Sequence, residues 1–182
     1  MTTNPVYKYI SKLCIDAQKV KEKAYTSLIR PKLEYSSCVW DPHTKSNISK
    51  LEMVQCRAAR YTCNRFHNTS SVTNMLTELK WPQLQLRRTR THLIFFSKII
   101  YHLYMLVAIY PTNLLVPSDS RTRQYTHSHS YRHIHISLDS YKYSFYPKTI
   151  VQWNLLPAAA VQCPTLDSFK EQIPLSVLQQ HI

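Results

Sequence analysis

Four histidines have a spacing that could bind a metal ion, in the pattern His127-x-His129-x3-His133-x-His135. In an extended strand, His-x-His places both rings on one face, so two such pairs could supply four nitrogen ligands. No cysteine and no pair of carboxylates lies near them in the sequence, and the neighbouring residues are mostly Ser, Thr and Tyr. We therefore expect a His-, Ser- and Tyr-rich surface loop here, with no metal site and no cofactor.

The cysteines and carboxylates give no pattern for catalysis. The five cysteines are odd in number and contain no Cys-x-x-Cys pair, so we expect reduced thiols in a reducing, intracellular compartment. Cys56 and Cys63 lie seven residues apart on one side of an expected helix, where buried structural thiols are the commoner outcome. The acidic residues are scattered, without an Asp-x-Asp or Glu-x-x-Glu pair to hold magnesium. We expect no enzyme activity and no catalytic residue.

Glycine is absent from all 182 residues, although average usage is about 7%. The phosphate-binding P-loop, the Gly-x-Gly dinucleotide fingerprint and the Gly-x-Ser-x-Gly nucleophile turn all need glycine. Tight hairpins of the Asn-Gly type are excluded as well, whereas helices lose nothing. The sequence therefore predicts a mainly helical protein, and we expect no small-molecule substrate.

Positive charge is the strongest functional signal. The net charge is +13, and residues 1–100 hold 17 Lys and Arg against 6 Asp and Glu. Residues 101–182 hold only 6 against 4. Two groups of cations stand out in the first half: Lys50, Arg57 and Arg60, then Arg87, Arg88 and Arg90. Arginine suits bidentate phosphate contact, and the many tyrosines offer stacking surfaces, so we expect binding to the phosphate backbone of RNA or DNA, with an anionic membrane surface as the second candidate.

One helix, expected over residues 45–66, would position the first group. Lys50, Arg57 and Arg60 fall within about 80° of each other on a helical wheel. A different face carries the apolar residues that we expect to pack inward. These are Ile48, Leu51, Val54, Ala58 and Tyr61.

The other expected elements are also helical. Residues 16–39 have helical spacing, with a kink or break at Arg30 because Pro31 disfavours helical backbone before it. Ser70 or Ser71 caps a short helix through 79, a long apolar helix covers 83–109, and helical runs follow over 147–156 and 165–173, the last capped by Thr165. Residues 111–144 show no helical period. We predict a mainly α, irregular helical bundle with regions 1–110, 111–144 and 145–182, the middle one extended or poorly ordered.

The apolar stretch from Leu93 to Tyr110 raises the alternative of a membrane-associated protein. Its 18 residues are the minimum for a span, but Lys98 and His102 would lie near the bilayer centre. A central lysine costs about 2.5–3.5 kcal/mol on insertion scales. A buried helix with one polar edge is the favoured interpretation.

Several strings resemble the region that follows the palm in non-LTR (LINE-type) retrotransposon reverse transcriptases. In chain order they are AYTSLIRPKLEY (24–35), VWDPHT (39–44), LEMVQCRAARY (51–61), SSVTNMLTELKWPQLQLRRTR (70–90), SRTRQ (120–124), SFYPKTIVQWNLLP (144–157) and TLDSFKEQ (165–172). The sequence departs from the family's pattern between Ile99 and Tyr110.

This resemblance implies a thumb and the region downstream of it, a helical unit that grips the template–primer duplex. It would make Arg57, Arg60, Arg87 and Arg88 contacts to the nucleic-acid backbone. The family's Phe/Tyr-x-Asp-Asp polymerase motif and its endonuclease are absent from this sequence, so we expect a non-catalytic reverse-transcriptase fragment. The alternative that stays open is a decayed mobile-element remnant without a selected function; the oligomeric state is not predicted.

Overall fold

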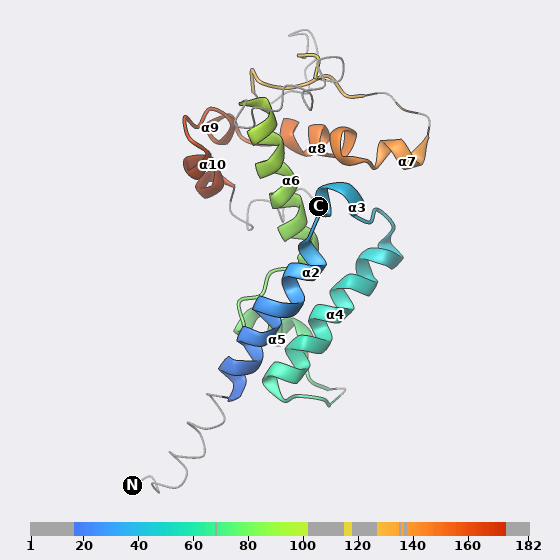
Figure 1. The fold of residues 1–182 in the computed structure, drawn as a ribbon, viewed down its shortest axis with the longest axis vertical. Coiled ribbons are helices and arrows are strands. Elements are labelled where there is room, and N and C mark those ends of the chain that lie inside the picture. Colours follow the sequence, from blue (N-terminus) through green and yellow to red (C-terminus); the bar gives the residue numbers. More distant parts are fainter. Residues whose placement is uncertain are drawn as a thin grey trace, which may run out of the picture. The chain divides into compact units, whose positions relative to one another are not determined.

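The computed structural model describes residues 17–67, 69–101, 115–117, 127–134, 136 and 138–173 (Figure 1). This part of the chain is mainly α-helical, which confirms the predicted fold class. Within it, β pairing is limited to one antiparallel bridge between Pro117 and Tyr131. The described residues form two compact units, 17–35 with 44–84 and 36–43 with 85–173. These units differ from the three regions predicted from the sequence, because residues 36–43 and 85–101 belong with the C-terminal helices.

The first unit begins with one continuous helical stretch. Residues 17–24 are helical, a π-helical turn η1 follows at Tyr25–Ile29, and α2 covers Arg30–Glu34. Of the predicted kink or break at Arg30, the break is wrong, since Arg30 keeps helical angles (φ −56°, ψ −42°) and its N–H donates to the carbonyl of Tyr25. The π turn lengthens the ladder by one residue just where the Pro31 ring would clash with the preceding turn. The helix ends instead at Tyr35, where ψ is 132°.

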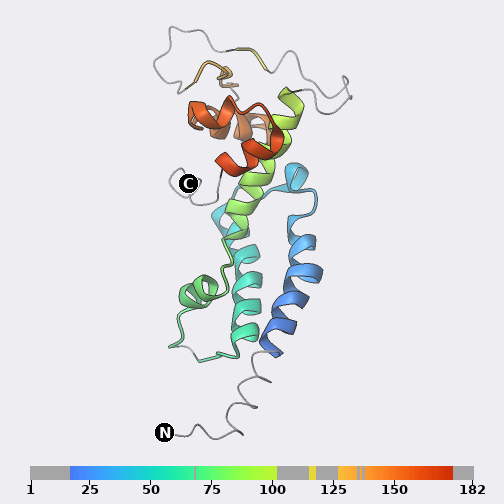
Figure 2. The same ribbon diagram turned by 90° about the vertical axis from the view of Figure 1, so that its left-hand side faces the viewer.

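The remaining helices of this unit are α4 (Lys45–Cys63) and α5 (Val72–Glu78). Figures 1 and 2 show α4 side by side with the helix of residues 17–34, and α5 packs against α4. The unit has a small core, in which the rings of Tyr25 and Trp81 stack with their centroids 4.3 Å apart. The buried apolar residues of this core are Tyr25, Ala59, Met75, Leu79 and Trp81.

The buried face of α4 is not the apolar face predicted from the sequence. Gln55, Ala59 and Thr62 are buried, whereas the predicted face is half-buried and ends at Tyr61, which is 57% exposed. Burying Gln55 is tolerated because its amide is satisfied on both sides. Its Oε1 accepts from the Tyr25 hydroxyl at 3.0 Å, and its Nε2 donates to the carbonyl of Pro82 at 2.9 Å.

Helix ends show how the chain manages without glycine. The predicted N-caps are confirmed: Ser71 Oγ accepts from the N–H of Asn74, and Thr165 Oγ1 accepts from the N–H of Ser168. At the opposite ends, three residues adopt the left-handed conformation that glycine usually supplies. They are Ser36 (φ 51°), Asn64 (φ 56°) and Lys80 (φ 53°). Only asparagine among them is well suited to that region, so the other two positions carry backbone strain.

The second unit is built around α6 (Leu84–Ile100), whose first residue belongs to the first unit. The unit also contains five short helices: α3 (Ser37–Trp40), α7 (Asp139–Lys142), α8 (Phe145–Asn154), α9 (Ala158–Val161) and α10 (Leu166–Gln172). Trp153 lies at the centre of the core, with its ring centroid 5.3 Å from Phe96 and 5.6 Å from Phe169. The predicted continuation of α6 to residue 109 lies outside the described residues.

Parts of the segment predicted as extended or poorly ordered pack into this core. Leu115 and Tyr131 are buried members of it. The side chain of Asn154 on α8 fastens the extended chain, since its Oδ1 accepts from Tyr131 N–H at 2.9 Å and its Nδ2 donates to Tyr131 O at 2.7 Å. Residues 127–131 are therefore tied to α8, and the His-rich stretch is not simply a surface loop.

In the described part of the chain we find no helix that combines the length and the apolar character needed to cross a bilayer. The stretch considered as a span, 93–110, falls partly outside that part.

Candidate nucleic-acid interface

The first predicted group of cations lies on the outer side of α4. Lys50 and Arg57 are exposed, and neither has an ion-pair or hydrogen-bond partner among the described residues. Arg60 is half-buried, and its Nη1 lies 3.4 Å from the carbonyl of His67, a weak hydrogen bond. The structure thus bears out the shared helix face on which these three residues were placed.

Contacts at both sides fix the position of α4 in its unit. Near its middle, Glu52 Oε2 accepts from the N–H of Leu84 at 3.2 Å. After its end, Arg65 makes a two-pronged ion pair with Glu78 of α5, at 2.9 and 3.2 Å. Lys21 contacts the end of the helix itself, donating to the carbonyl of Tyr61 at 3.2 Å. A cation at a helix C-terminus interacts favourably with the helix dipole.

A shallow apolar groove of about 340 Å³ lies beside these cations, between the helix of residues 17–34 and α4. Its lining joins apolar side chains to two cations. The residues are Lys21, Ala24, Tyr25, Ile29, Val54, Arg57, Ala58, Tyr61 and Thr62. Lys21 Nζ lies 4.5 Å from the centroid of the Tyr61 ring, a cation–π contact. The apolar face predicted to be core therefore forms part of the surface beside Arg57.

The second predicted group is occupied by structural contacts. Arg88 is buried, with its Nε 2.8 Å from Asp41 Oδ1, and its side chain has no exposed surface. The predicted backbone contact by Arg88 is therefore wrong, because this side chain lies in the interior and is not available to a phosphate at the surface. The wheel could not show this, because the partner carboxylate lies 47 positions earlier in the chain.

Arg90 and Arg87 are half-buried on the same helix. Arg90 holds the end of α10, since its Nε donates to the carbonyl of Ile173 at 3.1 Å and its Nη2 to that of Lys170 at 2.8 Å. Both arginines, with Thr91 and Ile94, line a niche of only about 60 Å³. Of the second group, only these two reach the surface, and Arg90 also has a structural role.

Asp41 forms the centre of a buried polar cluster in the second unit. It pairs with Lys148 through Oδ2 in addition to Arg88. His92 Nε2 lies 3.0 Å from the carbonyl of Ser37 and is a hydrogen-bond donor there. Burial lowers the pKa of His92, against the opposing influence of Asp41. His92 is therefore neutral at neutral pH, and the cluster carries two cations and one carboxylate.

The histidine pattern is not assembled as a metal site in the described residues. His127 is buried, and its Nε2 lies 3.0 Å from the carbonyl of Trp153. Burial also lowers the pKa of His127. His129 and His133 are exposed, and His135 lies outside the described residues. No group of three or more metal-ligating side chains is found in the part of the chain described.

The thiols have the character of structural residues. Cys38, Cys56, Cys63 and Cys163 are free and partly buried, and Cys14 lies outside the described residues. Burial raises the pKa of Cys38, Cys56 and Cys63. A raised pKa reduces the thiolate fraction at neutral pH, which disfavours nucleophilic reactivity.

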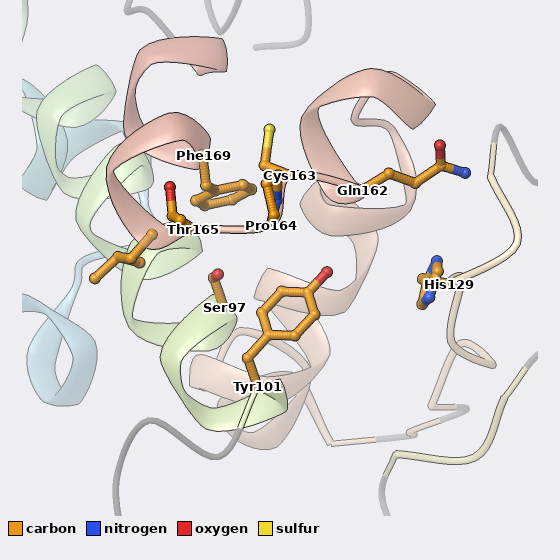
Figure 3. Close-up of a pocket in the computed structure, with 9 residues that line it drawn as sticks. Ser97, Tyr101, His129, Gln162, Cys163, Pro164, Thr165 and Phe169 are labelled. Carbon is orange, nitrogen blue, oxygen red and sulfur yellow. The ribbon is translucent and has the colours of Figure 1, made fainter.

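A pocket of about 740 Å³ lies in the second unit between the end of α6 and the segment that joins α9 to α10 (Figure 3). Its lining mixes aromatic and uncharged polar side chains. The residues are Ser97, Tyr101, His129, Gln162, Cys163, Pro164, Thr165, Leu166 and Phe169. No sequence motif marks this site, because its residues come from three separate segments of the chain.

Comparisons with known proteins identify no relative: no protein-family model matches the chain, and neither a curated protein nor a solved structure is similar to it.

Proposed function

We propose that the chain binds the phosphate backbone of nucleic acid, without sequence preference, through the exposed cations of α4. The observation that carries the proposal is the placement of Lys50 and Arg57 on one exposed face, without partners among the described residues. A cation that already has an ion-pair partner must give up that contact to bind a phosphate, whereas Lys50 and Arg57 lose no internal contact when they bind one.

The charge of the first unit supports this proposal. Its described residues include eleven Lys and Arg but only four Glu, which gives a net charge of +7. Of the four carboxylates, Glu78 is neutralised by Arg65, and Glu52 accepts a backbone N–H. A field of one sign over a small unit attracts a polyanion and raises its association rate.

The spacing of the cations also suits a nucleic-acid strand. Lys50 and Arg60 lie ten residues apart, about 15 Å along the helix. Phosphates of one strand recur about every 3.4 Å along the duplex axis, so the three side chains span roughly four phosphates. Arg60 would exchange its weak contact with His67 for a charge-assisted bond to phosphate. The α4 surface, defined as Lys50, Arg57 and Arg60, is therefore the proposed contact.

The resemblance to the thumb region of non-LTR reverse transcriptases agrees with this proposal. That resemblance implies that Arg57 and Arg60 contact the duplex. We propose accordingly that the chain is a non-catalytic thumb-like fragment. Arg87 and Arg90 would be secondary contacts at most, because Arg90 is engaged by α10.

A salt titration tests the proposal. Fluorescence anisotropy would measure the affinity of the full chain for two duplexes of unrelated sequence, at several salt concentrations. We expect the same affinity for both duplexes and a log K that falls linearly with log salt, with a slope near −0.9 for each phosphate contact. A flat line, or no saturable binding by a folded chain, would refute the proposal and favour the remnant.

A further inference from the structure

The pocket of the second unit has the size and chemistry of a small-molecule site. Its volume of about 740 Å³ lies within the ~300–1,000 Å³ typical of ligand pockets. Figure 3 shows the rings of Tyr101 and Phe169 on its walls, with the amide of Gln162 and the ring of His129 at one side. It is thus an aromatic cavity with polar groups gathered at one margin.

The aromatic walls are held in place by the fold. Phe169 is 2% exposed and packs against Trp153 in the core. The hydroxyl of Tyr101 donates to the carbonyl of Val161, which fixes the ring at the end of α6. The ring of Tyr101 is 38% exposed, so it offers a flat ligand a stacking or edge contact without an entropic cost for ordering the ring, while the buried Phe169 supports the wall.

The described lining of the pocket is polar at its margin but lacks the side chains that form most ion pairs. Among the described residues, it contains no Lys, Arg, Asp or Glu. Several of its polar atoms are already used: the Cys163 thiol donates to the carbonyl of Ala159, and Thr165 Oγ1 caps α10. The Gln162 amide is exposed and has no partner among the described residues. Ser128 Oγ lies 3.2 Å from His129 Nδ1, which leaves Nε2 of that ring for a ligand.

We propose that this pocket binds a nucleoside, with the base stacked on Tyr101 and the base edge hydrogen-bonded by Gln162. A carboxamide supplies both a donor and an acceptor, which matches the paired donor and acceptor on a base edge. A phosphate group gains no ion pair from the described lining, because none of those residues is a Lys or Arg. Every base has a π face, so stacking on an aromatic ring favours nucleobases as a class without distinguishing one base from another.

The nucleoside could come from two sources, free in solution or as an unpaired residue of a single strand. The recognition chemistry is the same for both. The inference stands apart from the backbone binding proposed for α4, because a free nucleoside carries no phosphate and its binding is insensitive to salt.

Protection of Cys163 tests the proposal, because this thiol lines the pocket. The full chain would be alkylated with iodoacetamide, and the rate at each cysteine followed by peptide mass spectrometry. Cys56, half-buried in the first unit and outside the pocket, is the internal control. We expect each common ribonucleoside to slow alkylation of Cys163 in a saturable way and to leave Cys56 unchanged, whereas inorganic phosphate protects neither thiol.

Two variants assign the effect to the site. Gln162→Ala removes the hydrogen-bonding amide from an exposed side chain, and Gln172→Ala removes the same amide from an exposed residue of α10 that does not line the pocket. One hydrogen bond corresponds to about a 2- to 10-fold change in affinity. We expect Gln162→Ala to raise the nucleoside concentration for half-protection by that factor, and Gln172→Ala to leave it unchanged.

The possible outcomes distinguish a site for a free nucleoside from a site for a single strand, and both from the absence of a nucleoside site. Protection by free nucleosides supports a site for the free compound, and Gln162-dependent protection by a short single-stranded oligonucleotide alone supports a site for a strand. No protection by either ligand, or protection that Gln162→Ala does not weaken, overturns the proposal. None of these results depends on the salt response of duplex binding, so each proposal can fail without the other.

Discussion

Replacing Asp41 by asparagine should destabilise the second unit strongly. The carboxylate is the counter-charge for both Arg88, whose side chain is fully buried, and Lys148. At 2.8 Å and an effective dielectric constant of about 20, the pair with Arg88 contributes roughly 6 kcal/mol of Coulomb attraction. Part of this attraction is offset in the parent protein by the cost of desolvating the Asp41 carboxylate, a cost that a neutral asparagine largely avoids. We therefore expect the free energy of unfolding to fall by about 3–5 kcal/mol, as for other buried pairs that lose one partner.

Urea unfolding followed by far-UV circular dichroism measures this loss. Asp167→Asn is a matched control, because Asp167 pairs with Lys170 at the surface and is 88% exposed, so its loss should leave stability unchanged. The double variant Asp41→Asn/Arg88→Met removes the buried charge together with its partner and should recover much of the loss. An Asp41→Asn protein as stable as the parent, or a double variant with the summed loss of both single changes, would refute the reasoning.

Three further predictions follow from the described geometry. Lys80→Gly should raise the free energy of unfolding by roughly 0.5–1 kcal/mol, because Lys80 has φ 53°, whereas Lys80→Ala should bring no gain; urea midpoints would check both. Burial lowers the pKa of His92 and His127, so the unfolded chain binds protons more readily than the folded chain. Stability should therefore fall as the pH drops below about 6.5, and His92→Gln should flatten that dependence in unfolding curves over a pH series. Arg65→Gln should leave duplex affinity nearly unchanged in anisotropy titrations, because Glu78 already neutralises Arg65.

The sequence predicted local features well because local chemistry determines them. Helix 45–66, the caps at Ser71 and Thr165, and the shared face of Lys50 and Arg57 depend on neighbours within a few residues. The absence of glycine also correctly indicated a helical protein, and the structure adds that Ser36, Asn64 and Lys80 occupy left-handed positions instead.

Features that depend on distant partners were not predictable. Periodicity placed Gln55 outside the apolar face of α4, but the Tyr25 hydroxyl and the carbonyl of Pro82 make it a buried residue. Arg88 has the sequence context of a surface cation, and only the approach of Asp41 makes it an interior one. The pocket around Gln162 likewise arises from segments that no sequence motif connects. In each case the decisive interaction spans many residues of chain.

The salt dependence of duplex binding by a variant of the α4 surface tests the central claim most directly. Lys50→Gln/Arg57→Gln removes two exposed cations from α4, and Arg132→Gln/Lys142→Gln removes the same charge from exposed residues of the second unit. We predict that the α4 variant reduces the slope of log K against log salt by about 2, one unit for each lost phosphate contact, while the control variant keeps the parent slope. Equal slopes for the two variants would contradict the assignment of backbone binding to α4.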